Sequence, residues 1–152
     1  MSRQSLCMQP ALQLHRLSFL LEKAADHALQ QTLDLTFSQC MILNSLQKNP
    51  GCSQRSIARC RDLTQAAVSR QVDVLHEKKL ISRIENAQNR REHILELTAR
   101  GTHQLEKGME IISAEFHAAF SLLKKGELQL LEHCVEKVLE EVRRTQGDPC
   151  VS

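Results

Sequence analysis

The side chains best suited to chemistry in this 152-residue sequence lie between residues 53 and 91, and their types favour binding of a polyanion. On a helical wheel, the candidate helix from Thr64 to about Lys79 carries small or polar side chains beside Arg70, opposite its apolar face. Small side chains let a helix enter a DNA major groove closely, and a guanidinium can pair with guanine O6 and N7 or with a phosphate. Arg90 and Arg91 follow in a polar stretch, where they can reach a minor groove or the backbone. These residues predict contact with double-stranded DNA.

Four segments supply the candidate DNA-binding residues: the start of a short helix, the helix that follows it, the first strand of a hairpin, and the hairpin tip. They are Ser53, Gln54, Arg55, Thr64, Gln65, Ala66, Ser69, Arg70, Arg83, Arg90 and Arg91. The alternative interpretation is that the polar helix face is only the solvated side of an amphipathic helix. A candidate recognition helix followed directly by a basic hairpin is more specific than either part alone.

The distribution of charge agrees with this location of the site. The whole chain has a formal net charge of only +2, but residues 53–91 hold nine Lys or Arg against four acids. Residues 101–152 hold six against nine, so a phosphate backbone would repel this part. The two regions are therefore expected to have different partners. The sequence shows neither an apolar run of the roughly 20 residues that a membrane span needs nor a secretory leader, which predicts a cytoplasmic protein with no membrane partner.

The six cysteines are the other reactive side chains, and reduced thiols are expected because no CxxC pair occurs. Cys7, Cys134 and Cys150 are candidates for a redox switch, since interleaved terminal helices would bring Cys7 of one subunit near Cys134 or Cys150 of another. The alternative is that Cys7 and Cys150 are idle terminal thiols and Cys134 is a small core residue. The seven histidines form no HxxxH pair, so we expect no metal and no cofactor.

Capping residues and apolar periodicity define the elements that must position these side chains. A helix is predicted between Pro10 and Gln31, with so many leucines that a second subunit is expected. Thr36 and Gln39 form a capping box for a second helix, which stops at Asn49-Pro50-Gly51. Ser53 can cap a short helix through Cys60, and Thr64 can cap the next.

The second half of the sequence predicts a hairpin and two long helices. Residues 80–85 and 92–97 alternate as strands around the polar stretch 86–91. Thr98 caps a helix through about Phe120, in which Gly101 and Gly108 are expected either to lower the stiffness or to be tolerated surface glycines. A last helix carries Leu128, Leu131, Val135, Val138 and Val142 in phase. The expected fold is mainly α with a small β wing: a winged helix-turn-helix at 35–97, with 1–34 and 98–152 as a helical dimerisation arm.

The stretch from Leu35 to Gly101 resembles the multiple-antibiotic-resistance regulator (MarR) family of bacterial transcription factors. The resemblance depends on LTQAAVSRQVDVLHEKKLISR, on the NRRE wing, and on the LELTARG that follows. It implies a homodimer whose two winged helices bind a pseudo-palindromic operator. On this resemblance, residues 64–70 belong to the recognition helix and Arg90 and Arg91 to the wing. Asn89 departs from the aspartate usual before those arginines, so the wing arginine loses a charge-assisted partner.

The resemblance also implies regulation, most often repression that is relieved by a small aromatic or anionic effector or by oxidation of a cysteine. Two other classes of function compete with it. An adaptor would use the winged helix to bind proteins instead of DNA, but it would have no need for arginines gathered on one face. An enzyme, for instance a thiol peroxidase, lacks support because the sequence has no catalytic triad order, phosphate-binding glycine loop or metal-ligand pair. We therefore expect no catalytic residues.

Overall fold

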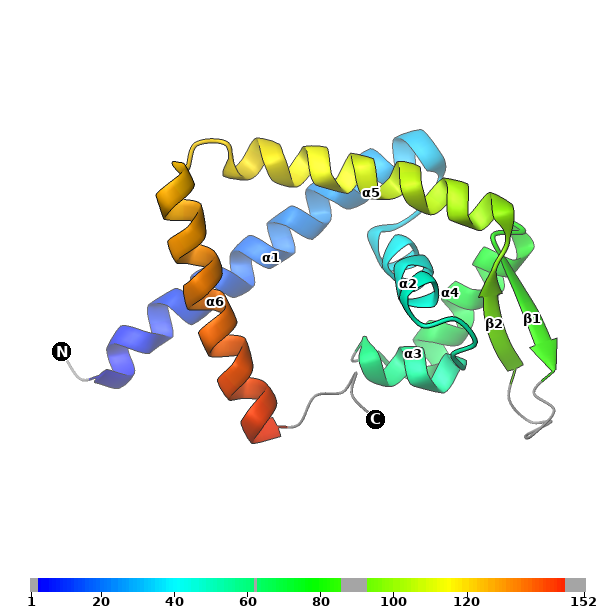
Figure 1. Cartoon of the computed structure of the whole chain (residues 1–152), viewed down its shortest axis with the longest axis horizontal. Coiled ribbons are helices and arrows are strands. Elements are labelled where there is room, and N and C mark those ends of the chain that lie inside the picture. The colour runs from blue at the N-terminus through cyan, green and yellow to red at the C-terminus, as the bar shows by residue number, and fades with distance from the viewer. Residues whose placement is uncertain (1–2, 62, 86–92, 147–152) are drawn as a thin grey trace.

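The computed structural model describes residues 3–61, 63–85 and 93–146, and it has the predicted fold class, mainly helical with a two-stranded antiparallel hairpin. In chain order the elements are α1 (Arg3–Leu33), α2 (Phe37–Lys48), α3 (Gln54–Cys60), α4 (Gln65–Glu77), β1 (Ile81–Glu85), β2 (His93–Leu97), α5 (Ala99–Phe120) and α6 (Lys125–Gln146). Figure 1 shows α2, α3, α4 and the hairpin gathered at one end, with α5 running from β2 across α1 to α6 at the other end. None of the described helices is long and apolar enough to cross a membrane.

Four predicted helix starts are confirmed by their capping hydrogen bonds. The Thr36 hydroxyl accepts from the Gln39 backbone N–H at 3.1 Å, and the Gln39 side chain accepts from the Thr36 N–H at 3.0 Å. Ser53, Thr64 and Thr98 cap α3, α4 and α5 in the same way. Each cap satisfies a backbone donor that the helix itself leaves without a partner. The first helix, however, begins earlier than predicted and contains Pro10, which lacks the N–H for the bond to the preceding turn.

The core lies where α1, α2, α4, the hairpin and α5 meet. Val68, Val72 and Leu75 form the buried face of α4, as the helical wheel predicted. Leu29, which lies beside the predicted apolar stripe of the first helix, is also fully buried. The other core residues are Ala25, Leu35, Cys40, Ile42, Leu43, Leu46, Ile57, Ala58, Leu80, Ile81, Leu95, Leu105 and Ile112. This core fixes α4 and the hairpin relative to each other.

Two glycines of α5 allow the helix and its neighbours to approach closely, and the alternative that they are tolerated surface glycines was wrong. Gly101 is buried, and a Cβ there would lie 1.9 Å from the backbone oxygen of Leu80. Gly108 is also buried, and its Cβ would lie 2.7 Å from the Sγ of Cys40. Sequence spacing carries no information about such contacts, because their partners lie in other elements.

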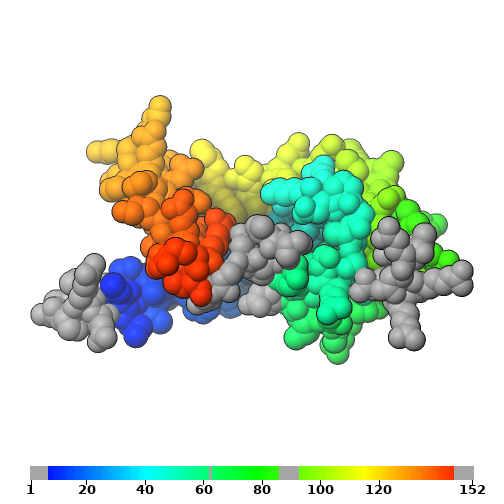
Figure 2. All heavy atoms as spheres, turned by 60° about the horizontal axis from the view of Figure 1, so that its bottom comes forward, coloured from blue at the N-terminus to red at the C-terminus, as the bar shows by residue number. Residues whose placement is uncertain are grey.

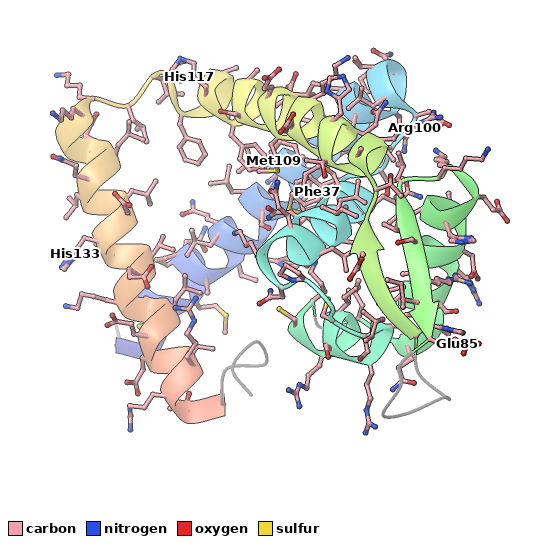
Figure 3. All side chains as sticks on the ribbon, turned by 45° about the vertical axis from the view of Figure 1, so that its right-hand side comes forward. Phe37, Glu85, Arg100, Met109, His117 and His133 are labelled. Atoms are coloured by element: carbon pink, nitrogen blue, oxygen red, sulfur yellow. The ribbon has the colours of Figure 1, made fainter. Side chains whose placement is uncertain are left out.

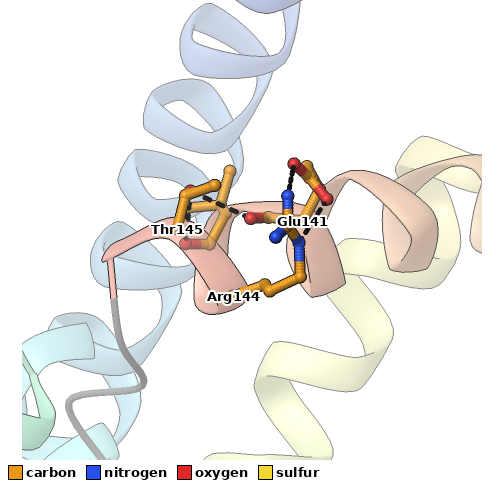
Figure 4. A network of polar contacts seen from close by, with 4 residues as sticks. Glu141, Arg144 and Thr145 are labelled. Carbon is orange, nitrogen blue, oxygen red and sulfur yellow. Dashed lines mark hydrogen bonds and ion pairs between the residues drawn. The ribbon is translucent and has the colours of Figure 1, made fainter.

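The opposite end of the molecule is poorly covered. No described side chain of α6 is buried, and those of α1 from Cys7 to Leu20 are exposed. Figure 2 shows the orange and red spheres of α6 standing at the other end of this face from the green winged helix. Polar side chains near the end of α6 contact residues of the same helix: Arg144 pairs with Glu141 at 2.7 Å, and the Thr145 hydroxyl donates to the Glu141 carbonyl (Figure 4). The Arg144 guanidinium keeps the pKa of Glu141 below its ordinary value.

Candidate nucleic-acid interface

The start of α4 and its outer face carry five of the eleven residues that the sequence assigned to DNA. Thr64, Gln65, Ala66 and Arg70 are exposed, and Ser69 is half-buried at the edge of the helix. The Thr64 hydroxyl accepts from the Ala67 N–H at 3.1 Å, so this residue caps the helix whatever else it binds. The first turn of α4 therefore presents small and polar side chains with one guanidinium a turn further on, which is the surface that a major groove admits.

The start of α3 is joined to the hairpin by backbone pairing. Ser53 pairs with Ile94 in an isolated bridge, and the Leu95 N–H donates to the Cys52 carbonyl at 3.1 Å. The Ser53 hydroxyl accepts from the Ser56 N–H and caps the helix, while Arg55 is exposed on the first turn. Ser53 thus caps the helix as predicted, and it also pairs with the hairpin, a role that the sequence analysis did not assign to it.

A hollow of about 380 Å³ brings residues of α3 and α4 together. Its lining residues are Arg55, Ser56, Ala58, Arg59, Leu63 and Gln65. Arg55 and Gln65 were predicted DNA contacts, whereas Arg59 and Ser56 were not. The signal that could have found Arg59 is its spacing, because residues i and i+4 of a helix lie on the same side. Two arginines and a glutamine thus contribute to the lining, and these are residue types that contact phosphates in protein–DNA complexes.

The hairpin projects toward the same end of the molecule as α3. Its strands pair in register from Ile81 with Leu97 to Glu85 with His93. Figure 3 shows Glu85, where β1 ends, at the end of the molecule that α3 also occupies. Arg83 is not oriented outward, because its guanidinium pairs with the Asp73 carboxylate of α4. Arg90 and Arg91 lie outside the described residues.

The comparisons with known proteins agree with this geometry. Residues 33–92 match the family model described as MarR family, and the helices on either side follow the arrangement of solved members. The segment 33–92 thus resembles the MarR family. Among solved structures, the fold of this chain is similar to that of the transcriptional regulator BldR of Sulfolobus solfataricus, with a TM-score of 0.82 at 23% identity over 93% of this chain and 99% of BldR.

Two further relatives extend the comparison. A crystal structure of the S. aureus MepR–DNA complex is 27% identical, with a TM-score of 0.74 over 86% of this chain and 96% of that one. The HTH-type transcriptional regulator YhbI of Bacillus subtilis is 24% identical over 101 residues, which are 66% of this chain and 66% of that protein. This chain therefore spans just under two thirds of the length of that curated relative.

The chain also has a cleft of about 510 Å³ between α1, the start of α2 and the turn after α3. Lys23 and Arg61 contribute cations to its wall, and Phe19 and Phe37 contribute aromatic rings. The Nε of Arg61 is buried and has no hydrogen-bond partner within the described parts of the chain. Asp26 holds the cleft in shape, because its carboxylate accepts from the Phe37 N–H at 2.7 Å.

A second hollow of about 550 Å³ lies between α2 and α5 and is almost wholly apolar. Phe37 and Phe116 line it, with ring centroids 6.4 Å apart. Met109 and His117 line the same hollow, and Figure 3 shows their places along α5. Leu128 of α6 closes part of it, so this hollow borders the exposed end of the molecule.

Cys60 is disulfide-bonded, so the expectation of reduced thiols is wrong at this position. The other cysteines fall into two groups. Cys7 and Cys134 are exposed free thiols, and Cys150 lies outside the described residues. Cys40 is fully buried, and burial raises its pKa to about 11. Burial also raises the pKa of Cys52. Because the thiolate is the reactive form, Cys40 and Cys52 are unsuited to a redox role, and Cys134 is not the small core residue that the alternative interpretation required.

Proposed function

We propose that this protein is a homodimeric, sequence-specific transcriptional regulator that binds a pseudo-palindromic site in double-stranded DNA. The observation that carries the proposal is the exposed first turn of α4, with Arg70 beyond it, beside the arginine-lined hollow of α3. The S. aureus relative described as a DNA complex supports the same partner. In this proposal residues 35–97 form the DNA-binding unit, and 1–34 with 98–152 form the dimerisation arm. The DNA contacts are those assigned from the sequence, including Arg90 and Arg91 of the wing, except for Arg83, whose guanidinium pairs with Asp73.

The experiment that tests this function is selection of bound duplexes from a random DNA library by the full-length protein. The expected result is a site with two related half-sites about one helical turn apart, because a two-fold dimer places its recognition helices one turn apart along the groove. Binding should weaken steeply with salt as phosphate contacts release counterions. A protein that selects no sequence and ignores salt would instead be a protein-binding adaptor.

The homodimer is supported by the apolar surface that one chain leaves uncovered. Eleven large hydrophobic side chains of α1 and α6 are exposed: Met8, Leu12, Leu14, Leu17, Phe19, Leu20, Leu128, Leu130, Val138, Leu139 and Val142. Monomeric proteins rarely expose apolar side chains gathered in this way. A second copy is the simplest cover, since a two-fold dimer places each chain's own α1 and α6 against those of its partner.

Val138→Asp is expected to convert the dimer to a monomer. Val138 is 58% exposed in one chain and would be buried between two, where an unpaired carboxylate costs about 3–5 kcal/mol. That cost raises the dimer dissociation constant by roughly a hundredfold or more. The molar mass in solution, measured by light scattering over a concentration series, gives the result. Gln129→Asp adds the same charge on the opposite face of α6, and it should stay dimeric.

The regulator is proposed to be a repressor that releases DNA when an effector binds or when a cysteine is oxidised. The cleft beside Phe19 and Phe37 supports a small aromatic effector with polar groups, because two aromatic rings line it together with the cations Lys23 and Arg61 and the acids Glu22 and Asp26. The exposed thiols of Cys7 and Cys134 support oxidation as the second route. In a dimer with interleaved arms, Cys7 of one subunit can meet Cys134 or Cys150 of the other.

Treatment with hydrogen peroxide is expected to produce a disulfide-linked dimer and to weaken DNA binding, with two thiols oxidised for each peroxide reduced to water. Non-reducing electrophoresis and a DNA-binding assay on the same samples measure both effects. Cys7→Ser should prevent the cross-link, because Cys7 is one of the two partners in either pairing. Cys40→Ser is the matched control, and it should leave the cross-link intact because the Cys40 thiol is buried and protonated. Unchanged mobility and affinity after oxidation would discard the redox route and leave the small effector.

A further inference from the structure

The recognition helix α4 and the hairpin are joined by an ion pair that the DNA-binding proposal does not use. Asp73 lies on the exposed side of α4, one turn beyond Ser69, and its Oδ1 accepts from Nη2 of Arg83 in β1. The two residues are ten apart in sequence, and α4 meets β1 through the turn at Lys78 and Lys79. The pair therefore crosses from one DNA-facing element to the other.

The environment of Arg83 makes this contact more than a surface ion pair. The side chain of Arg83 is 27% exposed, whereas that of Asp73 is 51% exposed. The Nε of Arg83 is fully buried and has no hydrogen-bond partner in the described part of the chain. Arg83 also pairs across the hairpin with Leu95, which is completely buried, so its backbone is anchored in the core. A guanidinium held in this way cannot turn out toward a phosphate without losing both its partner and its packing.

We infer that Asp73 and Arg83 are positioning residues, which hold the hairpin at a fixed angle to α4 so that both enter the DNA together. This inference rests on the proposed function, and it changes the role of Arg83 from a DNA contact to a support. The two roles predict opposite signs for one measurement. If the Asp73 carboxylate only faces DNA, it repels phosphate, and its removal should strengthen DNA binding. If the carboxylate positions the wing, its removal should weaken DNA binding.

The experiment measures affinity for the duplex that the wild-type protein selects from a random library, over a series of salt concentrations. Asp73→Asn is expected to weaken binding about fivefold, although it removes a negative charge, because a partly exposed ion pair contributes on the order of that factor. Asp73→Glu keeps the carboxylate and should bind nearly as well as wild type. The matched control is Glu77→Gln, which removes an exposed acid one turn further along α4 and should bind equally well or slightly better.

The salt dependence of DNA affinity distinguishes an Arg83 that positions the hairpin from an Arg83 that contacts a phosphate. Arg83→Ala should bind more weakly but keep the wild-type slope of log K against log salt, whereas loss of a phosphate contact lowers that slope by about 1. A lower slope, or an Asp73→Asn protein that binds as tightly as wild type, would overturn the inference. Amide exchange of β1 without DNA gives an independent readout, and it should quicken in Asp73→Asn. A wild-type protein that selects no duplex would refute the proposed function alone. Amide exchange of β1 in Asp73→Asn would still test whether the Asp73–Arg83 pair holds the hairpin in place.

Discussion

Gly101→Ala is expected to destabilise the folded protein by at least about 3 kcal/mol, since overpacking at a rigid contact costs 1–3 kcal/mol and sometimes more. The added Cβ would lie 1.9 Å from the Leu80 carbonyl oxygen and 2.9 Å from its carbon, so backbone must move. That oxygen already accepts from the Thr98 N–H at 3.1 Å and from its hydroxyl at 3.2 Å. The substitution therefore breaks the junction where the hairpin passes into α5.

Urea unfolding of wild type and variant at one protomer concentration measures this effect, because dimer stability depends on concentration. The control is Gly126→Ala in α6, where a Cβ meets nothing within 4 Å. Alanine is a better helix former than glycine by up to ~1 kcal/mol, so this variant should be equally or more stable. A Gly101→Ala protein as stable as wild type would mean that α5 does not approach Leu80 as closely as the structure places it.

Arg70→Ala is expected to weaken binding to the selected duplex by roughly 5- to 150-fold, which corresponds to the 1–3 kcal/mol of a bidentate contact to guanine. Arg70 is exposed on α4, and its charge is not needed for the core, which α4 joins through Val68, Val72 and Leu75. The variant should therefore fold normally. Repeating the duplex selection with it should show a relaxed preference at one base pair in each half-site.

The control for charge alone is Arg100→Ala. Arg100 is exposed in the first turn of α5, and Figure 3 shows it on the opposite side of the molecule from α3. Its loss removes the same charge from a surface that cannot meet the same duplex, so affinity and preference should stay near wild type. A uniform loss of affinity in Arg70→Ala, with the base preference unchanged, would place Arg70 on a phosphate instead of a base.

Local signals in the sequence determined the helices, the hairpin and the location of the candidate interface. Thr36, Ser53, Thr64 and Thr98 cap helices through atoms three residues away, so the chain itself carries the information. The apolar phase of α4 predicted its buried face, and the excess of Lys and Arg between residues 53 and 91 indicated which region is the candidate interface. Such features need no distant partner, and for that reason they are readable from sequence.

Only the tertiary structure decided the contacts between elements that are far apart along the chain. It showed that Gly101 and Gly108 are close-packing positions, that Arg59 shares a hollow with Gln65, and that Arg83 is paired with Asp73. It also showed that α6 stays uncovered in one chain. The physical reason is that burial and ion pairing depend on which side chains the folded backbone brings together, and no local spacing specifies that.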